Sequence, residues 1–168
     1  MTTVEHNYQL HHTVSLLLYK EARYLDDQNY DAWLDLLADD VEYWIPMSRD
    51  QVDPYLQVPL THEDKTLLTF RVNRLSHPVA HSVDRMPRST HVVSNILIDE
   101  EHSTEECLVV SSNFVTTGYQ EDPTNSQTIY SGTQIHRLSM VNNEYKISMK
   151  KIVLNDVDAP HGNIQIIL

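Results

Sequence analysis

The sequence predicts an α+β fold, in which helices from the first part of the chain cover one face of a strongly curved, mainly antiparallel sheet. Helical spacing of apolar residues is confined to the first part of the chain, while long segments of alternating side chains follow one another after residue 90. The links between those segments are short, which favours an antiparallel meander over alternating α/β units. No internal repeat or linker is visible, and we therefore expect a single domain over residues 1–168.

Three helices are expected in the first half of the chain. Residues 7–25 place apolar side chains at spacings of three and four, which is typical of a helix with one buried face. A second, shorter helix is predicted over residues 30–37, and Asp39 and Asp40 are expected to end it. A third helix is predicted over residues 63–75, because its apolar residues recur on one side.

The remaining elements are predicted to be strands. Residues 41–45 are aromatic and β-branched, and they precede residues 46–62, which contain three prolines and are predicted to form a loop or an irregular hairpin. Four longer strands are predicted at 90–98, 105–119, 128–140 and 145–155. Asn142 and Asn143 suit a tight turn between the last two strands, because Asn tolerates a positive φ. The apolar end, residues 164–168, is expected to be tied down in a core or against another subunit, and an edge strand of its own sheet is the alternative to an interface.

Charge and composition exclude several classes of protein. The chain has 168 residues with 12 Lys and Arg against 24 Asp and Glu, and this net charge of −12 disfavours nucleic acid and anionic membranes as partners. No apolar run is long enough to span a bilayer, and no signal-peptide pattern is visible, so we expect a cytoplasmic protein. The three glycines, Gly118, Gly132 and Gly162, are too far apart to form a phosphate-binding glycine loop.

Few residues are candidates for binding a metal or acting as a nucleophile. Cys107 is the only cysteine, so this chain cannot by itself hold a cysteine-rich zinc site or an iron–sulfur cluster. We expect Cys107 to be a small buried apolar residue. His77 and His81 are four residues apart, but Pro78 between them prevents a helical arrangement, so no metal site is predicted there.

One pair of residues is a candidate for acid–base chemistry. Asp26 follows the first predicted helix and His91 lies at the start of the first long strand. If both side chains point into the space between helices and sheet, the carboxylate would orient the imidazole as a general base. The alternative is that Asp26 caps the second helix and His91 is hydrogen-bonded in the wall of the fold.

Six segments together resemble a known family. Their sequences are LYKEARYLD at 18–26, YDAWL at 30–34, DDVEYWIP at 39–46, DKTL to RVNRL at 64–75, PRSTHVVSNI at 87–96 and KKIVLN at 150–155. In this order and spacing they resemble the small (beta) subunits of bacterial aromatic-ring-hydroxylating dioxygenases, which are Rieske non-heme iron enzymes. The resemblance extends over essentially the whole chain.

The resemblance implies a fold for this chain and separate structural and catalytic roles for two subunits. The fold would be the cystatin-like cone of nuclear transport factor 2 and its relatives. The chain would be a non-catalytic structural subunit, with no catalytic, cofactor-binding or metal-binding residues. A larger α subunit would carry the Rieske [2Fe-2S] cluster and a mononuclear iron, and three copies of each subunit would form an α3β3 hexamer. A reductase, sometimes through a ferredoxin, would pass electrons from NADH, and the complex would add O2 to an aromatic ring.

Two other functions are compatible with the same cone. Related families of lyases and isomerases act alone with an Asp–His dyad, for which Asp26 and His91 occupy plausible positions. A cone with an internal pocket could also be a small-molecule-binding module. Within the family, the loops at 46–62 and 76–90 vary, and they are candidates for contact with the α subunit.

Overall fold

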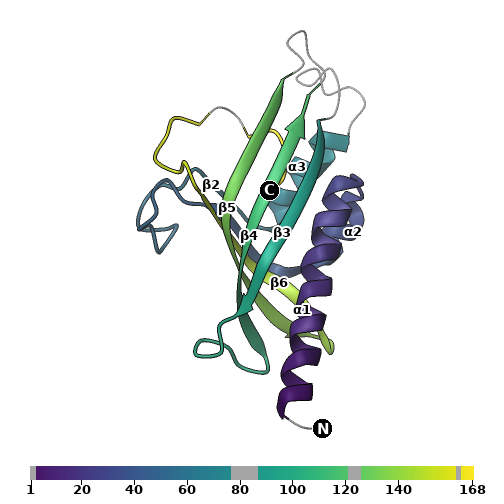
Figure 1. Ribbon diagram of the computed structural model, residues 1–168. Helices are drawn as coiled ribbons and strands as arrows, with labels where there is room; N and C mark the ends of the chain where they lie inside the picture. The colour runs from purple at the N-terminus through teal and green to yellow at the C-terminus, as the bar shows by residue number, and fades with distance from the viewer. Residues whose placement is uncertain (1–2, 77–86, 121–125, 162–163) are drawn as a thin grey trace.

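A computed structural model describes residues 3–76, 87–120, 126–161 and 164–168 (Figure 1). The elements in chain order are α1 (Thr3–Asp26), α2 (Tyr30–Asp35), β1 (Leu37–Ile45), β2 (Thr61–Glu63), α3 (Lys65–Ser76), β3 (Arg88–Ile98), β4 (Cys107–Tyr119), β5 (Gln127–Val141) and β6 (Glu144–Leu154). The helices come first and the long strands later, as the sequence predicts. No helix among the described residues is both long and apolar enough to cross a membrane.

The strands form one mixed sheet with the order β2-β1-β6-β5-β4-β3. Strands β3 to β6 make the predicted antiparallel meander, while β1 runs parallel to β6 and antiparallel to β2. Helix α1 packs along β3 at one edge of the sheet, and α3 packs against β1 near the opposite edge (Figure 1). The helices and the curved sheet therefore enclose a core between them.

The core follows from the periodicities of the sequence. On α1, Val14, Leu18 and Leu25 are buried on one face, as the spacing of three and four requires. In β4, alternate side chains such as Leu108 and Val110 point inward, and their neighbours point to the outer face of the sheet. The predicted turn is also confirmed, because Asn142 and Asn143 have φ angles of 51° and 66°.

One prediction about the first half of the chain is wrong, and another is decided between its two alternatives. Asp39 and Asp40 do not end a helix, because α2 already ends at Asp35 and both aspartates lie in β1. The pairing of β1 with β6 shifts its register between Leu37 and Glu42, and at this irregularity both aspartates are exposed. Over residues 46–62 the alternative of an irregular hairpin is confirmed, because β2 begins at Thr61 and pairs antiparallel with the end of β1.

The C-terminal segment is buried without forming a strand. Ile166, Ile167 and Leu168 are 7%, 3% and 0% exposed, and they belong to the core of this chain. The expectation that this end is tied down in a core is therefore confirmed, whereas the alternative of an edge strand is wrong, because the backbone has no strand pairing. The segment Ile164–Leu168, called the C-terminal tail below, instead packs between the sheet and the helices, where it reaches the candidate site.

Candidate functional site

The fold brings together the two residues that the sequence proposes as a dyad. Asp26 is the last residue of α1, and His91 lies in β3, the strand along which α1 packs. His91 Nδ1 is 2.6 Å from Asp26 Oδ1, and the side chains are only 4% and 16% exposed. The carboxylate also accepts the backbone N–H of His91, at 3.0 and 3.1 Å to its two oxygens. The dyad is therefore formed, buried and fixed in orientation.

The alternative role for Asp26, as a cap of the second helix, is wrong. Helix α2 is capped by Asn29, whose side chain accepts the backbone N–H of Ala32 at 3.4 Å. Asp26 lies one turn earlier and directs its carboxylate at His91 instead. The other half of that alternative is correct, because His91 is hydrogen-bonded at both ring nitrogens.

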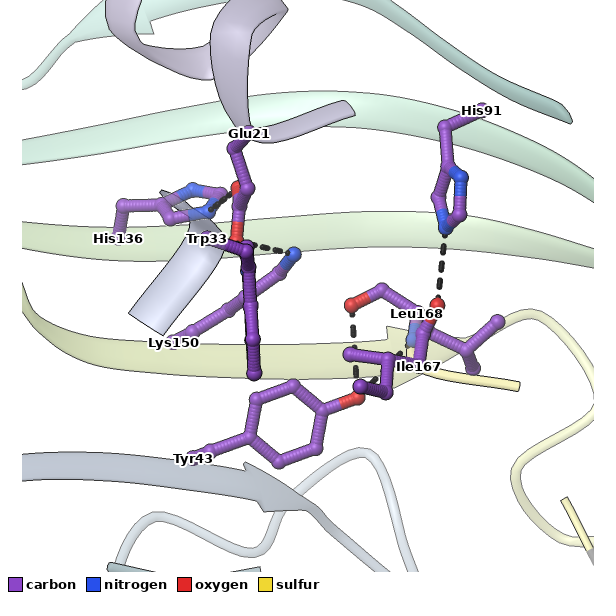
Figure 2. A network of polar contacts seen from close by, with 8 residues as sticks. All are labelled: Glu21, Trp33, Tyr43, His91, His136, Lys150, Ile167 and Leu168. Atoms are coloured by element: carbon purple, nitrogen blue, oxygen red, sulfur yellow. Dashed lines mark hydrogen bonds and ion pairs between the residues drawn. The ribbon is translucent and has the colours of Figure 1, made fainter. Parts of the chain in front are cut away.

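The C-terminal tail occupies the space in front of His91. His91 Nε2 lies 2.9 Å from the carbonyl oxygen of Ile167 (Figure 2). The Tyr43 hydroxyl accepts the backbone N–H of Leu168 at 3.1 Å and donates to its carbonyl at 3.4 Å. Burial raises the pKa of Tyr43 to about 12, and the phenol therefore stays protonated and able to donate at neutral pH.

A third side chain fixes the tail from the helical side. Arg71 on α3 donates to the carbonyl oxygens of Ile164 and Ile166, each at 3.1 Å. Its guanidinium also pairs with Glu63 on β2 at 2.8 Å. Side chains from β1, β3 and α3 thus hold the tail at successive carbonyl groups, as a bound peptide would be held.

These contacts engage both ring nitrogens of His91 within the chain. A carbonyl oxygen only accepts hydrogen bonds, so Nε2 must carry a proton to bind Ile167. The other nitrogen faces the Asp26 carboxylate, which already accepts the His91 backbone N–H. The tail thus occupies the position from which a substrate would have to reach Nε2.

There is also no room for a substrate at the dyad. The cavity beside His91 has a volume of about 10 Å³, and its lining combines apolar residues such as Leu25 and Phe114 with the polar side chains of Glu21, Gln134 and Lys150. A cavity of this size holds about one water molecule, whereas ligand pockets commonly enclose about 300 Å³ or more. The geometry of the dyad is that of a structural contact between α1, β3 and the tail.

A second polar cluster, which the sequence analysis did not identify, lies deeper in the core. Glu21 on α1 is 3% exposed and accepts hydrogen bonds through both carboxylate oxygens. Lys150 Nζ on β6 lies 2.8 Å from Glu21 Oε1, and His136 Nε2 on β5 lies 3.1 Å from Oε2. The indole N–H of Trp33 also points at Oε1, at 3.4 Å (Figure 2). We call these four residues the Glu21 cluster.

The Glu21 cluster holds one negative and one positive charge. Burial alone would raise the pKa of Glu21, but the charge of Lys150 and the hydrogen bonds from His136 and Lys150 outweigh it and hold the pKa well below its usual range. Burial lowers the pKa of His136 against the opposing pull of Glu21. His136 Nδ1 has no partner in the core, which is consistent with a neutral ring protonated at Nε2. The cluster is thus electrically balanced, with no exposed reactive group.

The signal for this cluster was present in the sequence. Glu21 lies three residues after Leu18 and four before Leu25, on the buried face of the predicted helix. Lys150 and His136 occupy inward positions in the alternation of their strands. Charged or titratable residues on three apolar faces predict a buried polar contact, because each would otherwise be desolvated without a partner.

The remaining candidates carry no chemistry that the structure shows. The prediction that Cys107 is buried is wrong. Cys107 lies on the outer side of β4 and is half-buried. His77 and His81 lie outside the described residues. Among the described residues there is no group of three or more His, Cys, Asp or Glu side chains that could hold a metal ion.

Comparison with known proteins gives consistent results. Residues 20–158 match the model of the family described as ring hydroxylating beta subunit. The chain is 34% identical over 161 residues to the small oxygenase component of a p-cumate 2,3-dioxygenase system from Pseudomonas putida, covering 90% of this chain and 83% of the relative. It is 29% identical to the small subunit of a 2-halobenzoate 1,2-dioxygenase from Burkholderia cepacia, covering 93% of each.

Solved structures support the same fold. The beta subunit of a benzoate 1,2-dioxygenase from Burkholderia mallei superposes with a TM-score of 0.71 at 24% identity, covering 92% of this chain and 95% of that chain. A candidate scytalone dehydratase from Novosphingobium aromaticivorans superposes with a TM-score of 0.68 at 13% identity, covering 91% and 89%. These likenesses confirm the α+β cone of nuclear transport factor 2 type, and the family match covers most of the chain. The chain therefore belongs to the family of ring-hydroxylating dioxygenase beta subunits.

Proposed function

We propose that this beta subunit is a non-catalytic, structural part of an oxygenase that adds O2 to an aromatic ring. The observation that carries the proposal is the position of the C-terminal tail. The tail fills the cone at the Asp26–His91 dyad, engages His91 through the Ile167 carbonyl, and leaves a cavity of only about 10 Å³. The interior of this cone serves to stabilise the subunit, so its contribution to the oxygenase would come from its surface.

The proposed partner is a large (α) subunit that carries the metal centres. A Rieske cluster is held by two Cys and two His, and this chain has one cysteine, so the cluster would belong to the partner. The mononuclear iron would lie there too, and together these centres would supply the redox chemistry. A reductase, sometimes through a ferredoxin, would deliver electrons from NADH. The loop after β1 supports contact with a partner, because Val52, Leu56 and Val58 in it are each about 80% exposed.

We further propose that the chain forms a trimer within an α3β3 hexamer. The outer face of β4 and β5 supports self-association because it carries few charges. The outward positions at its centre are Ser111, Asn113, Val115, Thr117, Ser131, Thr133 and Ile135. In a chain with a net charge of −12, copies would repel one another through most other surfaces, whereas this face can pack without burying unpaired charge.

A stand-alone lyase or isomerase is the second candidate, and the short Asp26–His91 contact is the observation in its favour. This candidate requires the tail to leave the cone, so that a substrate can reach His91 Nε2 in place of the Ile167 carbonyl. A small-molecule-binding module would require the same displacement. The structural role needs no such rearrangement and is the function that the geometry supports best.

The assembly experiment tests the proposal directly. The chain is purified from its native host through an affinity tag, and the eluate is examined by visible absorption and native mass spectrometry. We expect a brown complex that contains a larger iron–sulfur protein in equal copy number. A colourless eluate without such a partner would overturn the proposal.

A further inference from the structure

A groove unrelated to the dyad lies at the opposite end of α1. Its volume is about 970 Å³, and its apolar lining includes Leu10, Leu97, Leu108, Met140 and Tyr145. The start of α1, the β3–β4 connection and the β5–β6 turn meet at this end of the molecule (Figure 1). Leu97 is 65% exposed and Met140 is 39% exposed, so the groove presents apolar surface to solvent.

The rim of this groove is strongly acidic. The β3–β4 connection contains Glu100, Glu101, Glu105 and Glu106, all exposed, and no Lys or Arg. Within the described part of the chain, none of these four carboxylates forms an ion pair with Lys or Arg. An apolar floor inside a charged polar rim is the usual anatomy of a protein interface, with the apolar centre supplying affinity and the rim supplying orientation.

We propose that this groove binds a segment of the large oxygenase subunit in which an apolar side chain is flanked by Lys or Arg. The inference rests on the proposed function, because it assumes that a large subunit is the partner. The apolar side chain would lie over Leu97 and Met140, and the basic residues would face Glu100 and Glu105. All four contacts are made by residues of the groove itself.

A second copy of this chain is the poorer complement to the groove. Each copy has twice as many acidic as basic residues, so a homotypic contact would bring further negative charge to an acidic rim. The outer face of β4 and β5, by contrast, has the neutral character that a contact between copies requires. The two surfaces therefore suit two different partners.

The test is a binding titration of the purified large subunit with the full-length chain. We expect Leu97→Asp to weaken binding about tenfold or more, as truncation of a central interface residue does. Phe70→Asp on α3 is the matched control, because Phe70 is 66% exposed and lies outside the groove. Leu97→Ala serves as a milder second variant, and thermal melting checks that each variant is folded.

Charge reversal supplies an independent measurement. Wild-type binding should weaken as salt is raised, and the double variant Glu100→Lys/Glu105→Lys should bind more weakly at low salt and lose most of that salt dependence.

Each outcome separates the inference from the proposed function. If the wild-type chain binds but both Leu97 variants bind equally well, the groove assignment is overturned and the subunit role stands. Equal weakening by Phe70→Asp would also overturn the assignment, as would a Leu97→Asp chain that loses only its self-association. If the wild-type chain itself does not bind the large subunit, the proposed function fails.

Discussion

Replacing Lys150 with methionine should destabilise the protein strongly and reverse the direction of its pH dependence. Lys150 Nζ lies 2.8 Å from Glu21 Oε1, and the two side chains are 3% and 4% exposed. At an effective dielectric constant of about 20, two unit charges at this separation attract by about 6 kcal/mol. Most of that attraction offsets the desolvation of the two ions, and removal of one partner from a buried pair costs about 3–5 kcal/mol. Such a loss is a large part of the ~5–15 kcal/mol that stabilises a typical domain.

The reversal follows from the proton balance of Glu21. In the wild type the pKa of Glu21 is held low, so the unfolded chain takes up a proton first and stability falls as the pH falls below the usual range of a carboxyl group. Without Lys150, burial is no longer outweighed and raises the pKa of Glu21. The folded state of Lys150→Met then takes up the proton first, and its stability rises as the pH falls.

The loss of stability and its pH dependence are both measured by urea unfolding at about pH 8 and pH 5, followed by tryptophan fluorescence at fixed protein concentration. Lys151→Met is the control, since this neighbouring lysine is half-buried, donates one hydrogen bond to the Gln51 carbonyl at 2.6 Å and lies over the Trp44 ring, with Nζ 4.5 Å from the ring centroid. We expect it to lose about 1 kcal/mol at both pH values. A Lys150→Met variant that loses no more than Lys151→Met, or loses the same amount at both pH values, would refute the reasoning.

Three further predictions concern the core and the tail. The pKa of His136 is lowered from 6.5 in the folded state, so the unfolded chain takes up the proton first and the free energy of unfolding should decline as the pH falls below 6.5. In urea unfolding at several pH values, His136→Gln should make this decline shallower. Tyr43→Phe removes the hydroxyl that binds Leu168 and should cost about 1–3 kcal/mol, with faster amide exchange in the tail; unchanged exchange would contradict the contact. Gly132→Ala would push a Cβ into the Val153 carbonyl oxygen, so soluble, fully stable protein would contradict the β5–β6 register.

Local patterns in the sequence were sufficient to predict most of the fold. The spacing of Val14, Leu18 and Leu25 predicts α1, and the alternation of β4 predicts a long half-buried strand, because each depends only on neighbouring residues. The Asp26–His91 pair could also be anticipated, since the order of elements places the end of α1 beside the start of β3.

The remaining features depend on contacts between distant parts of the chain. The tail binds Tyr43 and His91, which are 125 and 76 residues away, and no local pattern identifies such partners. Asp39 and Asp40 would usually disfavour a strand, but they lie exposed at the register shift between Leu37 and Glu42, and the residues on either side of the shift pair with β6. Glu21 is missed by hydropathy alone, because its burial depends on cations contributed by strands late in the chain.

The central claim is that His91 fixes the tail and takes no part in chemistry, and His91→Gln tests it most directly. The glutamine amide can still donate to the Ile167 carbonyl but cannot serve as a general base. Product formation per assembled large subunit is measured with purified reductase and NADH, alongside the wild type. We predict turnover within about twofold of wild type. A fall of about 100-fold or more in a fully assembled complex, the usual effect of losing a general base, would contradict the account.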